Sequence, residues 1–200
     1  DRGIDGERAR AGFRGIHEML TQRPPGTRPV DGVLVTVLRW LLKYPEVLAW
    51  ETLWHESKES LARAMYGAIK TITPDAQVGW HVYHQGTTWD PIYRAATDYK
   101  VMAEYSDWIK PVVYHDIAGP RIRDWGVRGW KQRAFADLSE PQILELIYDV
   151  MGYDKKVEPG LEQLMTKGLS PDYVYRETKR CVDAVEGRVP VYAGLGFDIP

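Results

Sequence analysis

Stretches that read as β-strands alternate with stretches that read as α-helices along most of this 200-residue chain. Four segments have the apolar or period-two pattern of strands: residues 46–54, 77–84, 108–116 and 190–200. Helical patterns lie between them, and strands that alternate with helices form parallel crossover units. The pattern therefore predicts an α/β fold, either a doubly wound open sheet or a closed (β/α)8 barrel.

The helices are predicted from apolar residues at helical spacing and from local start and stop signals. Ser139 and Gln142 have the spacing of a capping box, and Gly152 ends the helix that follows. Ser170 is the expected N-cap of the last helix. The other helices are expected over residues 31–44, over residues 58–72 with Ser57 as the cap, and over residues 91–105.

The barrel is favoured because each predicted strand carries polar residues at its C-terminal end. These residues are Glu51, His84, His115 with Asp116, and Asp198. Barrel enzymes build their sites from the ends of several strands, whereas a nucleotide-binding open sheet needs a glycine-rich turn that this sequence lacks. A complete barrel takes about 250 residues. We therefore expect residues 1–200 to form one partial TIM barrel, a fragment of a larger domain, with residues 117–170 as an insertion over the barrel mouth.

Two of these acids stand next to small residues on the same strand face. Gly194 and Gly196 precede Asp198 at period two, and Ala49 precedes Glu51. Small neighbours leave room for a ligand to approach a carboxylate, although a structural ion pair is the alternative for Glu51. Two such acids at the ends of two different strands indicate a shared site more than two separate ion pairs.

Four parts of the chain carry a resemblance to a known family: Tyr44–Trp54, Val78–His81, Lys110–Tyr114 with Ala118–Arg121, and Gly194–Pro200. They resemble a family of bacterial TIM-barrel proteins described as glycoside hydrolases, which are distantly related to the β-galactosidase-like barrels. The resemblance covers most of the chain and implies that its strands are the fourth to the seventh of the barrel. It also implies that Glu51 is the acid/base and Asp198 the nucleophile. In this cleavage of a glycosidic bond, one carboxylic acid protonates the leaving oxygen and the other carboxylate attacks the anomeric carbon or activates water, with no metal and no cofactor. The sequence departs from the wider group at two points, because Trp50 replaces the usual Asn before the acid and Asp198 replaces the usual Glu.

Six further residues are expected to bind the sugar: Trp54, His84, Tyr114, His115, Asp116 and Arg121. Aromatic rings suit sugar rings, although aromatic residues also serve core packing. His81 and His84 lie on opposite faces of one predicted strand, and His84 is nearer its C-terminal end. The guanidinium of Arg121 suits a carboxylate or sulfate on an acidic sugar, or it ties the long insertion to the barrel.

Two other functions stay open at this point. His84, His115, Asp116 and Asp198 at adjacent strand ends would suit a metal-dependent hydrolase, although such barrels usually add a His-x-His pair that this sequence lacks. In a non-catalytic carbohydrate-binding barrel, Glu51 and Asp198 would only form hydrogen bonds with sugar hydroxyls. The two carboxylates make the hydrolase the preferred interpretation.

Composition excludes several partners. The formal net charge of −2 argues against a nucleic-acid surface, which is normally basic. No apolar run reaches the roughly 18 residues that span a bilayer. A single cysteine, Cys181, excludes an internal disulfide. The expected partner is therefore an oligosaccharide or polysaccharide, and the sequence does not predict an oligomeric state.

Overall fold

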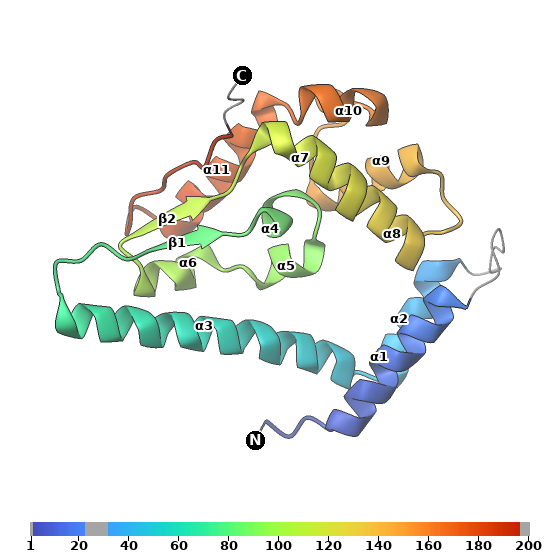
Figure 1. Ribbon diagram of the computed structural model, residues 1–200, viewed down its shortest axis with the longest axis horizontal. Coiled ribbons are helices and arrows are strands. Elements are labelled where there is room, and N and C mark those ends of the chain that lie inside the picture. The colour runs from blue at the N-terminus through green and yellow to red at the C-terminus, as the bar shows by residue number, and fades with distance from the viewer. Residues whose placement is uncertain (1, 23–31, 197–200) are drawn as a thin grey trace.

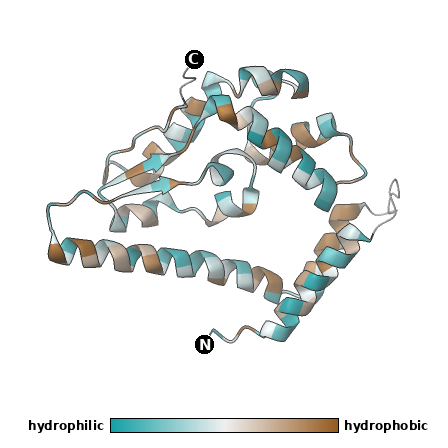
Figure 2. Ribbon diagram, viewed as in Figure 1, coloured by the Kyte–Doolittle hydropathy of each residue, from teal (hydrophilic) through white to brown (hydrophobic). Residues whose placement is uncertain are grey.

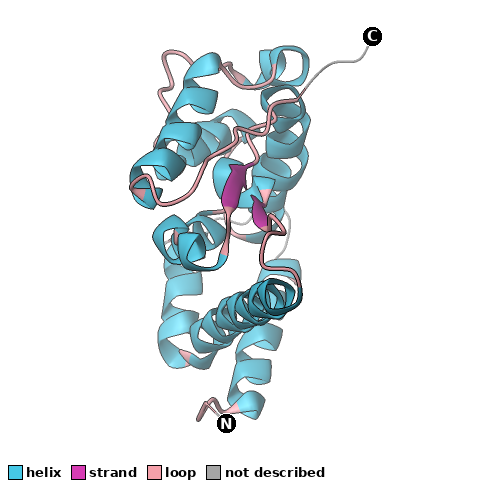
Figure 3. Ribbon diagram, turned by 90° about the vertical axis from the view of Figure 1, so that its left-hand side faces the viewer, coloured by secondary structure: helices cyan, strands magenta, loops and turns pink. Residues whose placement is uncertain are grey.

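Helices make up most of the molecule, and its strands are few and short (Figure 3). The computed structural model describes residues 2–22 and 32–196. In chain order the elements are α1 (Gly6–Thr21), α2 (Val33–Lys43), α3 (Glu46–Ile72), β1 (Gly79–Val82), α4 (His84–Thr88), α5 (Pro91–Ala96), α6 (Tyr99–Met102), the 3-10 turn η1 (Ala103–Tyr105), β2 (Trp108–Pro111), α7 (His115–Arg121), the π-helical turn η2 (Ile122–Val127), α8 (Arg128–Arg133), α9 (Glu140–Met151), α10 (Leu161–Lys167) and α11 (Pro171–Val185). The fold is thus mostly helical, with a small α/β part.

The sheet is built around β2. β1 pairs with it in parallel, with Gly79 opposite Trp108, and a Cβ atom at Gly79 would overlap the Trp108 indole. On the other side of β2, isolated parallel bridges join Ile109 to Val191 and Val112 to Gly194. The two helix-rich connections within the sheet therefore follow the parallel crossover pattern that the sequence predicts.

The prediction of a partial (β/α)8 TIM barrel is wrong. The described residues form one small sheet of two parallel strands, and the first predicted strand is helical. Residues 46–54 are the first turns of α3, which continues without a break to Ile72. Glu51 therefore projects from a helix and not from a strand end. His84 begins α4, and His115 and Asp116 begin α7, so these three residues also follow the strands instead of lying on them.

The 27-residue helix α3 forms one long side of the molecule, and α1 and α2 cross its N-terminal end (Figure 1). Its sequence is rich in Ala, Leu, Glu and Lys, which favour helices, and it has no proline. Figure 2 shows that hydrophobic residues recur along this helix. Several of them are exposed: Leu48, Trp50, Trp54, Leu61, Met65, Ile69 and Ile72.

Two clusters of buried residues form the core. The larger cluster joins α7, η2, α9, α10 and α11, and it contains Ile122, Ile143, Ile147, Leu164 and Tyr173. The smaller cluster lies between the sheet, α6 and α11: Val82, Tyr99, Ala103, Ile109, Cys181 and Val185. Residues 117–170, which the sequence analysis assigned to an insertion, supply most of the larger cluster.

The start and stop signals predicted for α9 and α11 are confirmed. α9 has the Ser139–Gln142 capping box and ends at Gly152 in the left-handed conformation, with φ of 74°. Ser170 caps α11, and its side chain accepts the backbone N–H groups of Asp172 and Tyr173. Ser57, by contrast, is not a cap but lies inside α3 and donates a 2.7 Å hydrogen bond to the Leu53 carbonyl.

Candidate functional site

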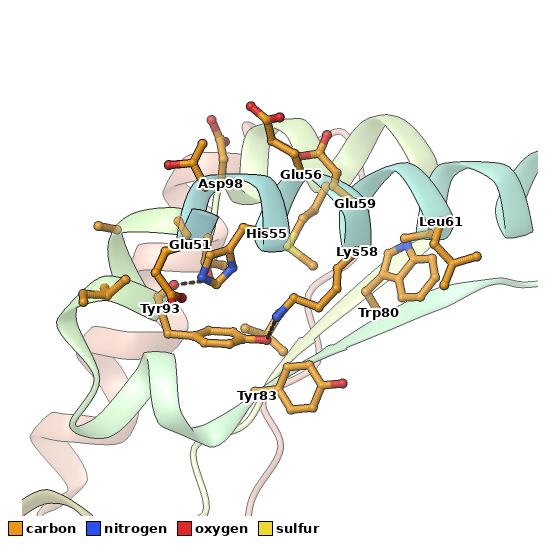
Figure 4. Close-up of a pocket in the computed structure, with 18 of the residues that line it drawn as sticks. Glu51, His55, Glu56, Lys58, Glu59, Leu61, Trp80, Tyr83, Tyr93 and Asp98 are labelled. Atoms are coloured by element: carbon orange, nitrogen blue, oxygen red, sulfur yellow. Dashed lines mark hydrogen bonds between the residues drawn. The ribbon is translucent and has the colours of Figure 1, made fainter. Parts of the chain in front are cut away.

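A cleft of about 810 Å³ lies between α3 and the part of the chain that runs from β1 through α5 to α6 (Figure 4). This volume is in the range of about 300–1,000 Å³ that is usual for small-molecule sites. The α3 wall of the cleft includes Glu51, His55, Lys58, Ala62 and Met65. Their spacing of four, three, four and three residues is that of one helix face, so the helical period itself aligns them along the cleft.

Aromatic side chains form much of the opposite wall: Trp80, Tyr83, Tyr93 and Tyr105. The Trp80 indole N–H donates a 2.7 Å hydrogen bond to the Tyr105 carbonyl, which holds the indole in place. The rings of Tyr83 and Tyr93 meet edge to face, with centroids 5.7 Å apart. Such rings offer flat apolar surfaces with polar edges, the kind of surface on which the C–H face of a sugar can stack.

The carboxylates that line the cleft differ in their partners. Asp98 caps α6 by accepting the backbone N–H groups of Lys100 and Val101 at 2.9 and 3.1 Å. Glu56 pairs with Arg2, and Glu59 pairs with Arg63. Among the described residues, no basic side chain lies within ion-pair distance of Glu51.

Glu51 also differs from these acids in orientation. Figure 4 shows Glu51, His55 and Lys58 extending from α3 toward Tyr93, whereas Glu56 and Glu59 extend to the other side of that helix. The structural ion pair considered for Glu51 from the sequence is therefore absent from the described part of the chain. Its carboxylate is available to a ligand in the cleft.

His55 and Lys58 complete the polar floor around Glu51. The Lys58 ammonium donates a 3.0 Å hydrogen bond to the Tyr93 hydroxyl. Burial and the charge of Lys58 lower the pKa of His55, and the charges of Glu51 and Asp90 act in the opposite direction. His55 is therefore mostly neutral at pH 7, with one ring nitrogen able to donate a hydrogen bond and the other able to accept one.

A second group of polar residues gathers where β1 and β2 end. We call this group the Tyr114 cluster; it consists of His81, His84, Lys110, Tyr114 and Arg121. The rings of His81 and His84 meet the Tyr114 ring edge-on, with centroids 6.3 and 6.0 Å away. The Lys110 ammonium lies 3.4 Å from the Tyr114 hydroxyl. His81 also lines the cleft, so the cleft and the cluster adjoin.

Arg121 and His84 form the buried end of the cluster. One guanidinium nitrogen of Arg121, Nη1, lies 2.9 Å from Nδ1 of His84, and its Cζ lies 5.7 Å from the centre of the Trp125 ring. Burial and, to a lesser extent, the charge of Arg121 lower the pKa of His84 to about 3, against the opposing charge of Asp116. The imidazole is therefore neutral at pH 7.

The structure thus brings together three of the residues that the sequence assigned to substrate binding: His84, Tyr114 and Arg121. Asp116 lies near enough to influence the charge of His84, and it packs against Gly196. The backbone carbonyl of His115 accepts the N–H group of Leu169 at 2.9 Å, which ties α7 to the segment after α10. Nδ1 of His115 and Oδ1 of Asp116 are buried without a hydrogen-bond partner in the described part of the chain.

Two other predicted residues are placed differently. Trp54 is 58% exposed and is not among the residues that line the cleft, although the Lys58 ammonium lies 5.3 Å from its ring centre. Asp198 lies outside the described residues. Sequence reasoning missed His55, Lys58 and Tyr93. The first two would have been found by extending the helical period of residues 58–72 back to Glu51.

Within residues 2–22 and 32–196, no helix is long and apolar enough to cross a membrane. In the same ranges, no three His, Cys, Asp or Glu side chains are grouped in a way that would hold a metal ion. The chain matches no protein-family model, no curated protein and no solved structure.

Proposed function

We propose that this chain belongs to a carbohydrate-active hydrolase whose sugar-binding site is the cleft between α3 and β1. The observation that carries the proposal is the unpaired carboxylate of Glu51. It faces Tyr93 across the cleft, and it has no ion-pair partner among the described residues. A carboxylate held in this way beside aromatic rings is suited to a ligand rich in hydroxyl groups.

The residues around Glu51 would contribute to sugar binding in two ways. The rings of Trp80, Tyr83 and Tyr93 offer apolar faces to the sugar. His55 and Lys58 supply polar atoms that would hold hydroxyl groups next to the Glu51 carboxyl. In hydrolysis, Glu51 would donate the proton that the leaving glycosidic oxygen needs.

Hydrolysis requires a second carboxylate, and Asp198 is the residue that the sequence analysis assigns to this role. A second candidate function follows from the other acids of the cleft. Asp98, Glu56 and Glu59 are engaged as a helix cap or in ion pairs, so Glu51 is the one unengaged carboxylate among the described residues that line the cleft. This favours a site that binds carbohydrate without cleaving it as the alternative.

Glu51→Gln separates the two functions. The wild-type chain and the variant would be assayed on a panel of nitrophenyl glycosides and oligosaccharides, with binding measured by calorimetry on the same sugars. If the protein is a hydrolase, the variant loses roughly 100-fold or more in kcat, the usual effect of removing a general acid. If it only binds sugar, the wild type shows no turnover and Glu51→Gln weakens binding modestly.

Glu145→Gln is the matched control, because it makes the same chemical change at an exposed position of α9. It should leave both turnover and binding unchanged. Failure of the wild-type chain to bind any sugar of the panel would overturn the proposed function in both forms.

A further inference from the structure

The cleft between α3 and β1 has a polar end and an apolar end. Along α3, the side chains that extend toward Tyr93 come first: Glu51, His55 and Lys58. Apolar side chains that line the cleft follow: Leu61, Ala62 and Met65. Figure 4 shows Leu61 and Trp80 on the side of Lys58 that is away from Glu51. The Trp80 ring in turn meets the Tyr105 ring edge to face, with centroids 5.9 Å apart. We define the apolar end by five side chains: Leu61, Ala62, Met65, Trp80 and Tyr105.

The contact between Lys58 and Tyr93 marks the boundary between the two ends. The Lys58 ammonium starts from α3 and reaches Tyr93 of α5, where it donates a 3.0 Å hydrogen bond to the hydroxyl and lies 4.5 Å from the ring centre. Residues of both ends line one cleft of about 810 Å³, so the space continues past this contact. This volume exceeds what a single sugar ring fills. A ligand whose sugar lies beside Glu51 therefore extends toward the apolar end.

The apolar side chains that α3 contributes to this end are not part of the core. The helix packs on α1 at its N-terminal end and on η1 nearer its C-terminal end. Leu61 and Met65 are 62% and 49% exposed. The described structure therefore leaves apolar surface open on this wall of the cleft. Moving such a surface from water into contact with an apolar ligand is favourable.

A second sugar ring does not suit the chemistry of the apolar end. Of its five side chains, only Trp80 and Tyr105 carry an N–H or O–H group. The Trp80 indole N–H is already engaged, because it donates a 2.7 Å hydrogen bond to the Tyr105 carbonyl. A sugar ring carries several hydroxyl groups, and each one that leaves water without a new partner costs free energy. An alkyl or aryl group carries no such cost.

We infer that the apolar end binds the aglycone of a glycoside, so that the ligand class is a sugar linked to an alkyl or aryl alcohol. The sugar lies beside Glu51 and Tyr93, and the apolar group lies against Leu61, Met65 and the Trp80 ring. Trp80 stands next to the boundary, so its ring contacts both parts of the ligand. The inference rests on the proposed function, which identifies the polar end as a sugar site.

The test uses the methyl, butyl and hexyl β-D-glucosides and β-D-galactosides, with cellotriose as the comparison. NMR titration of the whole chain gives the dissociation constant of each ligand, including weak ones. Each methylene group that enters an apolar site should raise the affinity about two- to fourfold. The hexyl glycosides should therefore bind about 30-fold or more tightly than the methyl glycosides. Hexyl glucoside should also bind more tightly than cellotriose.

Two variants show whether the alkyl chain lies in the apolar end. Met65→Gln places an amide there, and Ala62→Phe fills the space with a ring. Each should reduce the gain from methyl to hexyl to about threefold or less. Should Ala62→Phe not fold, as judged by circular dichroism, Met65→Gln at its exposed position gives the same reading. Met165→Gln is the matched control, because this methionine is 39% exposed on α10 and does not line the cleft. It should keep the wild-type gain.

Hexan-1-ol, the aglycone without its sugar, separates this inference from the proposed function. Equal affinity for methyl and hexyl glycosides, tighter binding of cellotriose, or a gain that Met65→Gln and Ala62→Phe leave intact overturns the aglycone site and leaves the sugar site standing. Hexan-1-ol binding that depends on Met65, without binding of any glycoside, supports an apolar site but overturns both its assignment to glycosides and the proposed function. Binding of neither hexan-1-ol nor any glycoside overturns both.

Discussion

Nη1 of Arg121, at the end of α7, lies 2.9 Å from Nδ1 of His84, at the start of α4, although 37 residues separate them in the chain. The contact sets the tautomer of the buried imidazole, because only an unprotonated Nδ1 can accept this hydrogen bond. It also joins two segments that follow neighbouring parallel strands. The carboxyl ends of such strands meet at one edge of a sheet, which is where ligand sites of α/β folds gather.

Protonation of His84 should destabilise the folded protein in mild acid. Its pKa in the folded state is lowered to about 3, whereas a histidine in the unfolded chain has a pKa of about 6.5. The unfolded state therefore takes up the proton first as the pH falls. The stability that neutral His84 provides is complete above about pH 6.5 and is lost toward pH 3, at about 1.4 kcal/mol per pH unit.

Urea unfolding at pH 7.0 and pH 4.5 measures this effect. The drop in unfolding free energy between these pH values should be about 2–3 kcal/mol larger for the wild type than for His84→Gln. The same substitution at His17, which is exposed on α1, should leave the wild-type drop unchanged. An equal drop in the wild type and in His84→Gln would contradict the neutral, buried state of this residue.

The charges around His55 should shift its pKa in opposite directions. Lys58 lowers the pKa of His55 and Glu51 raises it. Lys58→Met should therefore raise the pKa of His55, and Glu51→Gln should lower it. NMR titration of the His55 ring protons measures both shifts, and shifts of the same sign would mean that the three side chains do not meet in the cleft as described.

Removal of Glu177 should strongly destabilise the protein. This carboxylate is 1% exposed, and it pairs with Arg94 at 2.7 Å and with Arg180 at 3.1 Å. Glu177→Gln leaves the guanidinium of Arg94, which is largely buried, without its counter-charge, and breaking a buried pair costs about 3–5 kcal/mol. Denaturant unfolding would measure the loss. Asp183→Asn is the control, because its pair with Lys179 is exposed and is worth about 1 kcal/mol or less.

Two glycine-to-alanine changes should have opposite effects on stability. In Gly79→Ala the new methyl group would overlap the Trp108 indole across the β1–β2 pair, and overpacking of this kind costs about 1–3 kcal/mol. In Gly67→Ala the methyl group meets open space in the C-terminal part of α3, where alanine is favoured over glycine by about 0.5–1 kcal/mol. Thermal unfolding of both variants checks the signs. A stable Gly79→Ala variant would argue against the close approach of the two strands.

The features that the sequence predicted correctly depend on neighbours in the chain. The capping box of Ser139 and Gln142, the helix end at Gly152 and the N-cap Ser170 all involve backbone groups within a few residues. Such interactions form wherever the local sequence supports them. Residues 77–84 and 108–116 were likewise predicted as strands; β1 is the central part of the first range and β2 the beginning of the second.

The error over residues 46–54 has a physical cause as well. A run of nine mostly apolar residues fits a buried strand and also part of a helical stripe, and the tryptophans in it favour strands. The run continues from Glu46 to Ile72 without a proline, so the helix is extended by cooperative addition of one hydrogen bond per residue. The assignment of Glu51 to a strand end, and with it the barrel, depended on a window that was too short.

The sequence by itself determined the ends of several helices, two parallel strands and a set of polar residues that follow those strands. The tertiary structure alone decided which of these residues meet. It placed Glu51 beside His55 and Tyr93 and joined His84 to Arg121. The physical reason is that such contacts arise when α3 packs on α1 and η1, and when α7 packs on η2, α10 and α11, to bury their apolar neighbours. Packing of this kind depends on the whole core and not on the local pattern around any one residue.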